Sequence, residues 1–140
     1  MTSISNALRR LVTLRARNSC EYCLIPQDSR LFGFEVDHII AEKHHGLTED
    51  RNLCLSCLDC NRHKGSDFAS FDPDTGAIAL LFNPRLDRWN EHFRLENATI
   101  EGITPTGRVT VFLLQFNDPD RVSFRSALIE LGRYPPESVH

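Results

Sequence analysis

Apolar residues near the N-terminus recur with the period of an α-helix. They stand three or four positions apart, at Ile4, Leu8, Leu11 and Leu14. A serine at position 3 or 5 can cap the first turn of such a helix. We therefore predict a helix that runs to about Arg17 and turns the four apolar side chains toward the core.

The next segment predicts two strands followed by a helix. Residues 31–40 are rich in apolar side chains and predict a strand, and residues 53–55 predict a short return strand after the polar loop 41–50. Residues 58–64 favour a short helix, because Gly65 stands where glycine commonly ends one. The pattern is that of a hairpin with a long loop, followed by a helix.

Downstream, a strong turn signal from Asp72 to Gly76 separates two apolar pieces and predicts a second hairpin. The pattern then predicts a pair of short strands and two further helices. The ranges of these six elements are 68–71, 78–82, 93–95, 99–100, 106–116 and 119–131. Helices mixed with local hairpins make the predicted fold class α+β.

Length and composition indicate one ordinary globular domain. The 140 residues, 41% of them hydrophobic and 25% charged, are too few for two cores of typical size. We expect a single domain over 1–140, with a core motif over 20–65 and an extension over 66–140 packed on it. Apolar runs fall far short of the roughly 20 residues of a membrane span. Since the N-terminus also lacks a signal-peptide pattern, we expect a cytoplasmic protein without membrane contact.

The net charge of -3 is unevenly distributed along the chain. Residues 1–64 carry nine basic and eight acidic side chains, whereas residues 65–140 carry seven and eleven. The first segment includes four arginines without an acid among them: Arg9, Arg10, Arg15 and Arg17. This cluster is either a phosphate-facing patch or an ordinary solvated helix face.

Four cysteines form two identical pairs, Cys20-x-x-Cys23 and Cys57-x-x-Cys60. This spacing lets both thiolates of a pair reach one ion, and two pairs complete a tetrahedral zinc shell. With four protein ligands the zinc would be structural and closed to substrate. The alternative, two disulfides, needs an oxidising compartment to which nothing in the sequence points.

Cys54 is the fifth cysteine and stands three positions before Cys57. We expect it to be a buried free thiol that packs as a small hydrophobic side chain. The alternative is that it competes as a metal ligand.

The order of these motifs resembles the HNH endonuclease family, whose fold is the ββα-metal motif. The resemblance extends from Cys20 to Gly65. It rests on the two cysteine pairs together with Val36-Asp37-His38-Ile39-Ile40, Gly46, Asn52-Leu53, and the sequence Asn61-x-x-Lys64-Gly65 after Cys60. Ala41 stands where many members of the family carry proline.

The resemblance implies catalytic roles for three side chains. His38 would be the general base, and a neutral imidazole can accept a proton from attacking water. Asp37 and Asn61 would hold one catalytic divalent ion. Their oxygen atoms suit Mg²⁺ or Mn²⁺. The competing interpretation of His38 is a structural histidine on a strand.

Three further residues receive supporting roles from the same resemblance. Asn52 would brace the long loop so that His38 points at the phosphate, which is compatible with an ordinary turn asparagine. Lys64 and Arg62 would contact substrate phosphate, the alternative being solvated side chains.

The C-terminal half resembles an extension found in bacterial, especially cyanobacterial, HNH proteins. It contains Leu81-Phe82-Asn83-Pro84-Arg85 and, further on, Thr104-Pro105-Thr106-Gly107-Arg108. Trp89 and Phe93 are expected to pack on the core, whereas Arg85 and His92 either pack there or line a substrate groove.

The sequence thus favours a metal-dependent endonuclease that hydrolyses DNA, with RNA as the weaker alternative substrate because the mechanism uses water. Efficient cutting of both strands would favour a homodimer. One competing hypothesis is a zinc-dependent nucleic-acid-binding module without catalysis. Another is an interaction protein that binds its partner through the C-terminal half.

Overall fold

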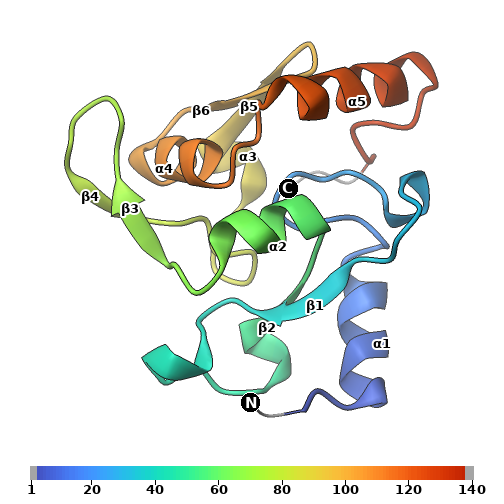
Figure 1. Cartoon of the computed structure of the whole chain (residues 1–140), viewed down its shortest axis with the longest axis vertical. Coiled ribbons are helices and arrows are strands. Elements are labelled where there is room, and N and C mark those ends of the chain that lie inside the picture. Colours follow the sequence, from blue (N-terminus) through green and yellow to red (C-terminus); the bar gives the residue numbers. More distant parts are fainter. Residues whose placement is uncertain (1–2, 138–140) are drawn as a thin grey trace.

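A short antiparallel hairpin and the helix after it form the centre of the fold. The computed structural model describes residues 3–137. Strand β1 (Glu35–His38) pairs with β2 (Leu53–Ser56), with His38 opposite Leu53, and α2 (Leu58–Lys64) follows directly. This arrangement confirms the predicted order of two strands and a helix (Figure 1).

Strand β1 is shorter than the predicted 31–40. Its partner β2 offers only four residues, because Cys57 already caps α2 by accepting a hydrogen bond from the backbone N–H of Cys60. Leu31 and Phe32, which the prediction placed in the strand, lie in the preceding turn and are 92% and 67% exposed. The length of the pairing strand therefore limits β1, although the apolar run is longer.

Helix α1 (Asn6–Arg15) packs on the outer face of the hairpin, and Ser5 caps it as predicted. Its buried side differs from the predicted stripe of residues 4, 8, 11 and 14. Val12 is fully buried, whereas Leu11 and Leu14 are 46% and 67% exposed. A two-stranded sheet is too narrow to cover a wide helix face, so the contact follows steps of four residues through Ile4, Leu8, Val12 and Ala16.

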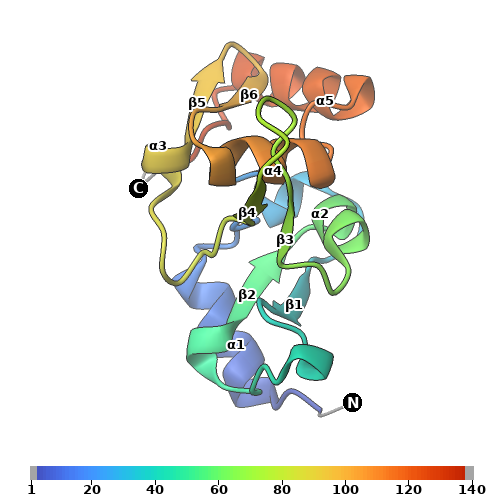
Figure 2. The same cartoon turned by 90° about the vertical axis from the view of Figure 1, so that its left-hand side faces the viewer.

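The extension contains the predicted hairpin, strand pair and helices close to their predicted positions, which confirms the α+β class. It lies at the opposite end of the molecule from α1 and β1 (Figures 1 and 2). Its elements are β3 (Ala69–Phe71), β4 (Ile78–Leu80), α3 (Trp89–His92), β5 (Phe93–Glu96), β6 (Thr99–Gly102), α4 (Pro105–Leu113) and α5 (Pro119–Glu130). Each strand pair is antiparallel. No helix in residues 3–137 is long and apolar enough to cross a membrane.

One apolar cluster joins the extension to the turn that carries Cys20 and Cys23. Trp89 and Phe93 are buried in it, as expected from their spacing. The indole N–H of Trp89 donates to the Tyr22 carbonyl at 2.8 Å, so the extension also satisfies a buried backbone group of that turn.

A buried carboxylate fixes the β3–β4 hairpin on α4. Asp72 is 1% exposed and accepts hydrogen bonds from Arg108 Nε and Nη2 at 3.0 and 2.8 Å. It also accepts from the Asp74 amide and the Thr75 hydroxyl. The Arg108 guanidinium, helped by the Asp74 amide, holds the pKa of Asp72 well below its ordinary value, so the carboxylate is charged in the folded chain.

We expect Asp72→Ala to lower the midpoint of thermal unfolding by several degrees more than Asp74→Ala at pH 7. Both carboxylates contact Arg108, but the Asp74 side chain is 67% exposed and its ion pair is screened by water. Circular dichroism on the two variants measures the difference. Equal midpoints would show that the buried pair does not hold the hairpin.

Candidate functional site

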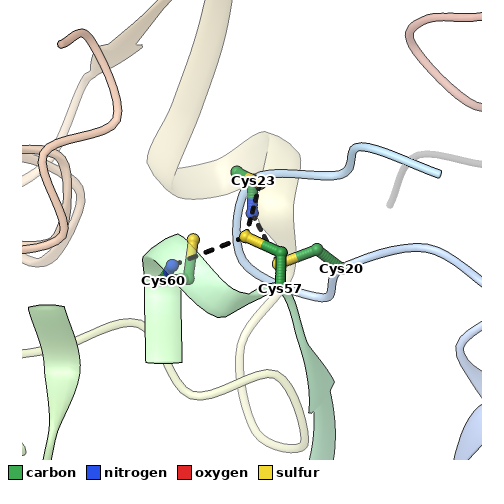
Figure 3. A group of neighbouring side chains, drawn as sticks. All are labelled: Cys20, Cys23, Cys57 and Cys60. Atoms are coloured by element: carbon green, nitrogen blue, oxygen red, sulfur yellow. Dashed lines mark hydrogen bonds between the residues drawn. The ribbon is translucent and has the colours of Figure 1, made fainter. Parts of the chain in front are cut away.

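The four paired cysteines converge on one point in the fold (Figure 3). Cys20 and Cys23 stand on the turn after α1, and Cys57 and Cys60 stand at the start of α2. All four are buried, and their sulfur atoms lie within 4.8 Å of one another. The backbone N–H of Cys23 points at Cys20 Sγ, and that of Cys60 points at Cys57 Sγ, at 3.5 and 3.4 Å. The two turns therefore present their thiols in the same way.

The spacing of the sulfur atoms fits a tetrahedral metal ion. A zinc–sulfur distance of about 2.3 Å places tetrahedral ligand atoms about 3.8 Å apart. The sulfur atoms of Cys23 and Cys57 lie 3.7 Å apart. All five cysteines are free thiols in the structure, so the disulfide alternative is not adopted. The four cysteines are thus positioned to hold a metal ion, with no position left for substrate.

Cys54 lies outside this cluster. It is 1% exposed, and its sulfur faces the Tyr22 hydroxyl at 3.6 Å. Burial raises the pKa of its thiol to about 12, which keeps it protonated. The expectation of a buried free thiol is confirmed.

His38 ends β1 and is 7% exposed. Its Nε2 lies 2.8 Å from the Thr48 hydroxyl and 3.6 Å from a carboxylate oxygen of Glu42. Both partners come from the loop between β1 and β2, and the sequence analysis named neither. Glu42 follows His38 by four positions, but only the folded loop brings it and Thr48 to the same nitrogen.

Asn52 closes the base of that loop. Its side-chain oxygen accepts from the Ile40 amide at 2.9 Å, and its Nδ2 donates to the carbonyls of Ile40 and Leu47, each at 2.9 Å. Gly46 packs so closely that a Cβ there would lie 1.8 Å from the Ile40 carbonyl oxygen. The loop conformation that surrounds His38 therefore requires both an amide side chain at 52 and a glycine at 46.

Asp37 and Asn61 lie on the two elements that frame the motif. Asp37 stands on β1 opposite Cys54, and Asn61 stands on the first turns of α2, which packs against β1. Both side chains are half-buried. Carboxylate and amide oxygens in these positions are the donor types that a hard divalent ion takes.

Lys64 points into the protein. It is 3% exposed, and its ammonium donates to the Ile39 carbonyl at 2.8 Å. Burial lowers the pKa of the Lys64 ammonium, and the Asp37 carboxylate partly offsets this effect. A direct phosphate contact would require the ammonium to leave this carbonyl. Arg62, by contrast, is 73% exposed and pairs with Asp59 at 3.3 Å.

Other basic side chains proposed for substrate are engaged in internal contacts. Arg15 donates to the carbonyls of Asp50 and Leu53, each at 2.9 Å, and so ties α1 to the start of β2. Arg85 pairs with Glu21. His92 contacts the Thr104 hydroxyl at 2.6 Å. These contacts favour the packing interpretation of Arg85 and His92.

Arg121 of α5 is a site residue that the sequence analysis missed. Its Nη2 lies 3.0 Å from the Cys60 sulfur. Burial opposes its charge, but the nearby cysteines outweigh burial and raise its pKa. No local pattern links an arginine on the last helix to cysteines 61 and 64 positions earlier, so only the fold could reveal the contact.

Comparison with known proteins agrees with this geometry. Residues 20–67 match the family model described as HNH endonuclease. This segment is a domain of the HNH endonuclease family, which confirms the resemblance, and it includes all four metal-site cysteines.

The chain is also similar to a curated bacterial protein. It is 28% identical over 116 residues to the Septu protein PtuB of Bacillus thuringiensis. The aligned region covers 81% of this chain and 42% of that protein, so the chain spans less than half of its relative's length. No solved structure matches the chain.

We expect Cys57→Ser to lose the bound metal and unfold the motif, because a structural metal supplies folding free energy that the apo chain lacks. Cys54→Ala is the matched control. It removes a neighbouring buried thiol outside the cluster and should keep about one metal ion per chain. Metal content by mass spectrometry and circular dichroism measure both effects. Equal metal loss in the two variants would contradict the assignment of the ligands.

Proposed function

We propose that this chain is a metal-dependent endonuclease that hydrolyses phosphodiester bonds in DNA, with RNA as the weaker alternative. The observation that carries the proposal is the placement of His38. It ends β1 within the HNH match, and Asn52 and the loop around it fix its surroundings. A binding module would have no need of a histidine oriented in this way.

The cysteine cluster is proposed to hold a structural zinc ion. Four thiolates at tetrahedral spacing are a donor set typical of zinc, and they leave no position open for water or phosphate. This ion would join the turn at residues 20–23 to α2, so its contribution is to folding and to the placement of β1.

His38 is proposed to be the general base, acting through Nδ1. Its Nε2 faces Thr48 and the carboxylate of Glu42. Because the negative charge of a nearby carboxylate attracts a proton, the arrangement favours the tautomer that carries its proton on Nε2 and donates it to the Thr48 hydroxyl. The lone pair on Nδ1 would then remain available for a proton from the attacking water.

Asp37 and Asn61 are proposed to hold one catalytic Mg²⁺ or Mn²⁺ ion. Such an ion would stabilise negative charge on the phosphate and on the leaving oxygen. Asn52 acts on the reaction through the loop that it closes. Arg62 is exposed on α2, and its guanidinium could turn from Asp59 toward substrate phosphate.

The role of Lys64 in this proposal depends on its hydrogen bond. In the structure its ammonium holds the Ile39 carbonyl, immediately after His38. Positioning the end of β1 therefore accounts for its burial, and phosphate binding would be a second role that needs a rearrangement.

A cytoplasmic location and a homodimer that cuts both strands remain part of the proposal.

The alternative is a zinc-dependent nucleic-acid-binding module without catalysis. It needs the cysteine cluster and Arg62 but not His38. The nuclease therefore needs His38 for cleavage, whereas the binding module would bind nucleic acid equally well without it.

We expect the purified chain to nick or linearise supercoiled plasmid with Mg²⁺ or Mn²⁺. Cleavage should stop in EDTA and fall by at least about a hundredfold in His38→Ala, the lower range for loss of a general base. Circular dichroism and zinc content of the variant should match wild type. A chain that binds DNA but cuts neither plasmid, single-stranded DNA nor RNA would leave the binding module in place of the nuclease.

We expect Glu42→Gln to lower kcat about tenfold or more with little change in KM, because Gln no longer offers a charged acceptor to Nε2 of His38. Glu49→Gln is the matched control. Both glutamates lie in the loop and are 35% exposed, but Glu49 pairs with Arg51. A larger loss in the control, or a change confined to KM, would argue against tautomer control by Glu42.

A further inference from the structure

Two buried arginines lie on α5 of the extension, and Arg121 contacts the cysteine cluster. Arg121 is 9% exposed and Arg125 is 1% exposed, and their spacing of four residues places them on one side of the helix. Burying a guanidinium is costly unless an anion or several acceptors compensate for the lost water. The burial of each side chain therefore requires either an anion or several acceptors.

Arg121 directs its guanidinium at the cysteine sulfurs. Nη2 lies 3.0 Å from Cys60 Sγ and 3.9 Å from Cys57 Sγ. Nη1 donates to the carbonyls of Leu114 and Gln115 at 2.6 and 3.1 Å, which fixes the group from behind. The guanidinium is thus held against the thiols by the segment that joins α4 to α5.

Carboxylates near Arg121 do not fully account for its burial. Asp59 lies 3.9 Å from its Nε, at the limit of an ion pair, and closer pairs at 3.3 Å join Asp59 to Arg30 and Arg62. Asp59 is thus shared among three arginines. The nearest group to Arg121 that can carry a negative charge is Cys60 Sγ.

Arg125 is buried among neutral acceptors. Its Nε donates to the Ala98 carbonyl at 2.8 Å and its Nη2 to Asn117 Oδ1 at 3.0 Å. No ion pair between Arg125 and a carboxylate occurs in residues 3–137 of the structure. Burial is the largest influence on the pKa of Arg125 and lowers it.

Zinc binding would give the cysteine cluster the negative charge that Arg121 needs. Four thiolates around one Zn²⁺ carry a net charge of about -2, because a coordinating thiol is deprotonated. Arg121 supplies one positive charge in direct contact with a ligand sulfur. Four neutral thiols would leave Arg121 with only a share of the Asp59 carboxylate.

We propose that Arg121, supplied by the extension, completes the metal centre by donating to the Cys60 thiolate. Zinc binding and the docking of α5 are therefore coupled. The coupling is reciprocal: zinc stabilises the docked helix, and the docked helix tightens the binding of zinc.

Another contact from the same region supports this coupling. The hydroxyl of Tyr134, which follows α5, donates to the Cys23 carbonyl at 2.8 Å. The C-terminal segment thus contacts both cysteine pairs, one through a thiol and one through the backbone. The extension acts as a part of the metal centre in addition to its role as a covering layer.

The test compares zinc affinity in full-length Arg121→Gln, Arg121→Lys and Arg133→Gln by competition with a chromophoric chelator. Arg133 is the control, because its side chain is 40% exposed and pairs with the exposed carboxylate of Asp28 instead of a cysteine. We expect Arg121→Gln to bind zinc about tenfold to a hundredfold more weakly, the usual effect of removing a partner of a metal ligand. Arg121→Lys should recover much of the loss because it keeps the charge, and Arg133→Gln should equal wild type.

A spectroscopic measurement on cobalt-substituted protein separates this role from simple packing. Removing a donor from a thiolate raises the energy of its electrons, so the sulfur-to-cobalt charge-transfer band of Arg121→Gln should move to lower energy. The tetrahedral ligand-field bands should persist. An unchanged charge-transfer band, or equal zinc affinity in the Gln and Lys variants, would overturn the proposal.

If Arg121→Gln does not fold, the coupling between zinc and α5 is tested on the wild-type chain. Amide exchange of α5 should speed up when zinc is removed, and α5 that stays protected after zinc removal would overturn the coupling.

The inference rests on the zinc centre of the proposed function and not on catalysis. A wild-type chain that takes up no zinc would therefore overturn both the zinc assignment and this inference, whereas a zinc-bound chain without nuclease activity would overturn only the proposed reaction.

Discussion

The convergence of four cysteines is the constraint on which the rest of the structure depends. The two pairs are separated by more than thirty residues, and between them lies a hairpin whose strands have only four residues each. A two-stranded hairpin of this length is marginal in water. Joining the turn at residues 20–23 to the start of α2 holds both ends of the hairpin, and β1 is the strand that carries Asp37 and His38.

The extension strengthens the same constraint from the other side. Trp89 and Tyr134 donate to backbone carbonyls of the cysteine turn, and Arg121 reaches the Cys60 sulfur. Buried carbonyls without partners would cost free energy, and a metal centre of net negative charge would be poorly tolerated in an apolar core. The extension, whose sequence shows no metal-binding motif, therefore contacts the cysteine cluster directly.

The proposed active site depends on a second, smaller set of constraints in the loop before β2. Asn52 joins three backbone groups across the loop, and Gly46 leaves room for the Ile40 carbonyl. Thr48 and Glu42 are thereby placed at Nε2 of His38. The proposed base is thus oriented by side chains that belong to the same loop.

The sequence alone determined the features that arise from local spacing. Cys-x-x-Cys pairs indicate a shared ion because the chelating geometry is set within four residues, and the strand–strand–helix order follows from short-range periodicity. Tertiary structure decided which side of α1 is buried, that Lys64 points inward, and that Arg121 meets Cys60. Each of these depends on a partner far away in the chain, and burial and long-range charge contacts have no period along the sequence from which they could be predicted.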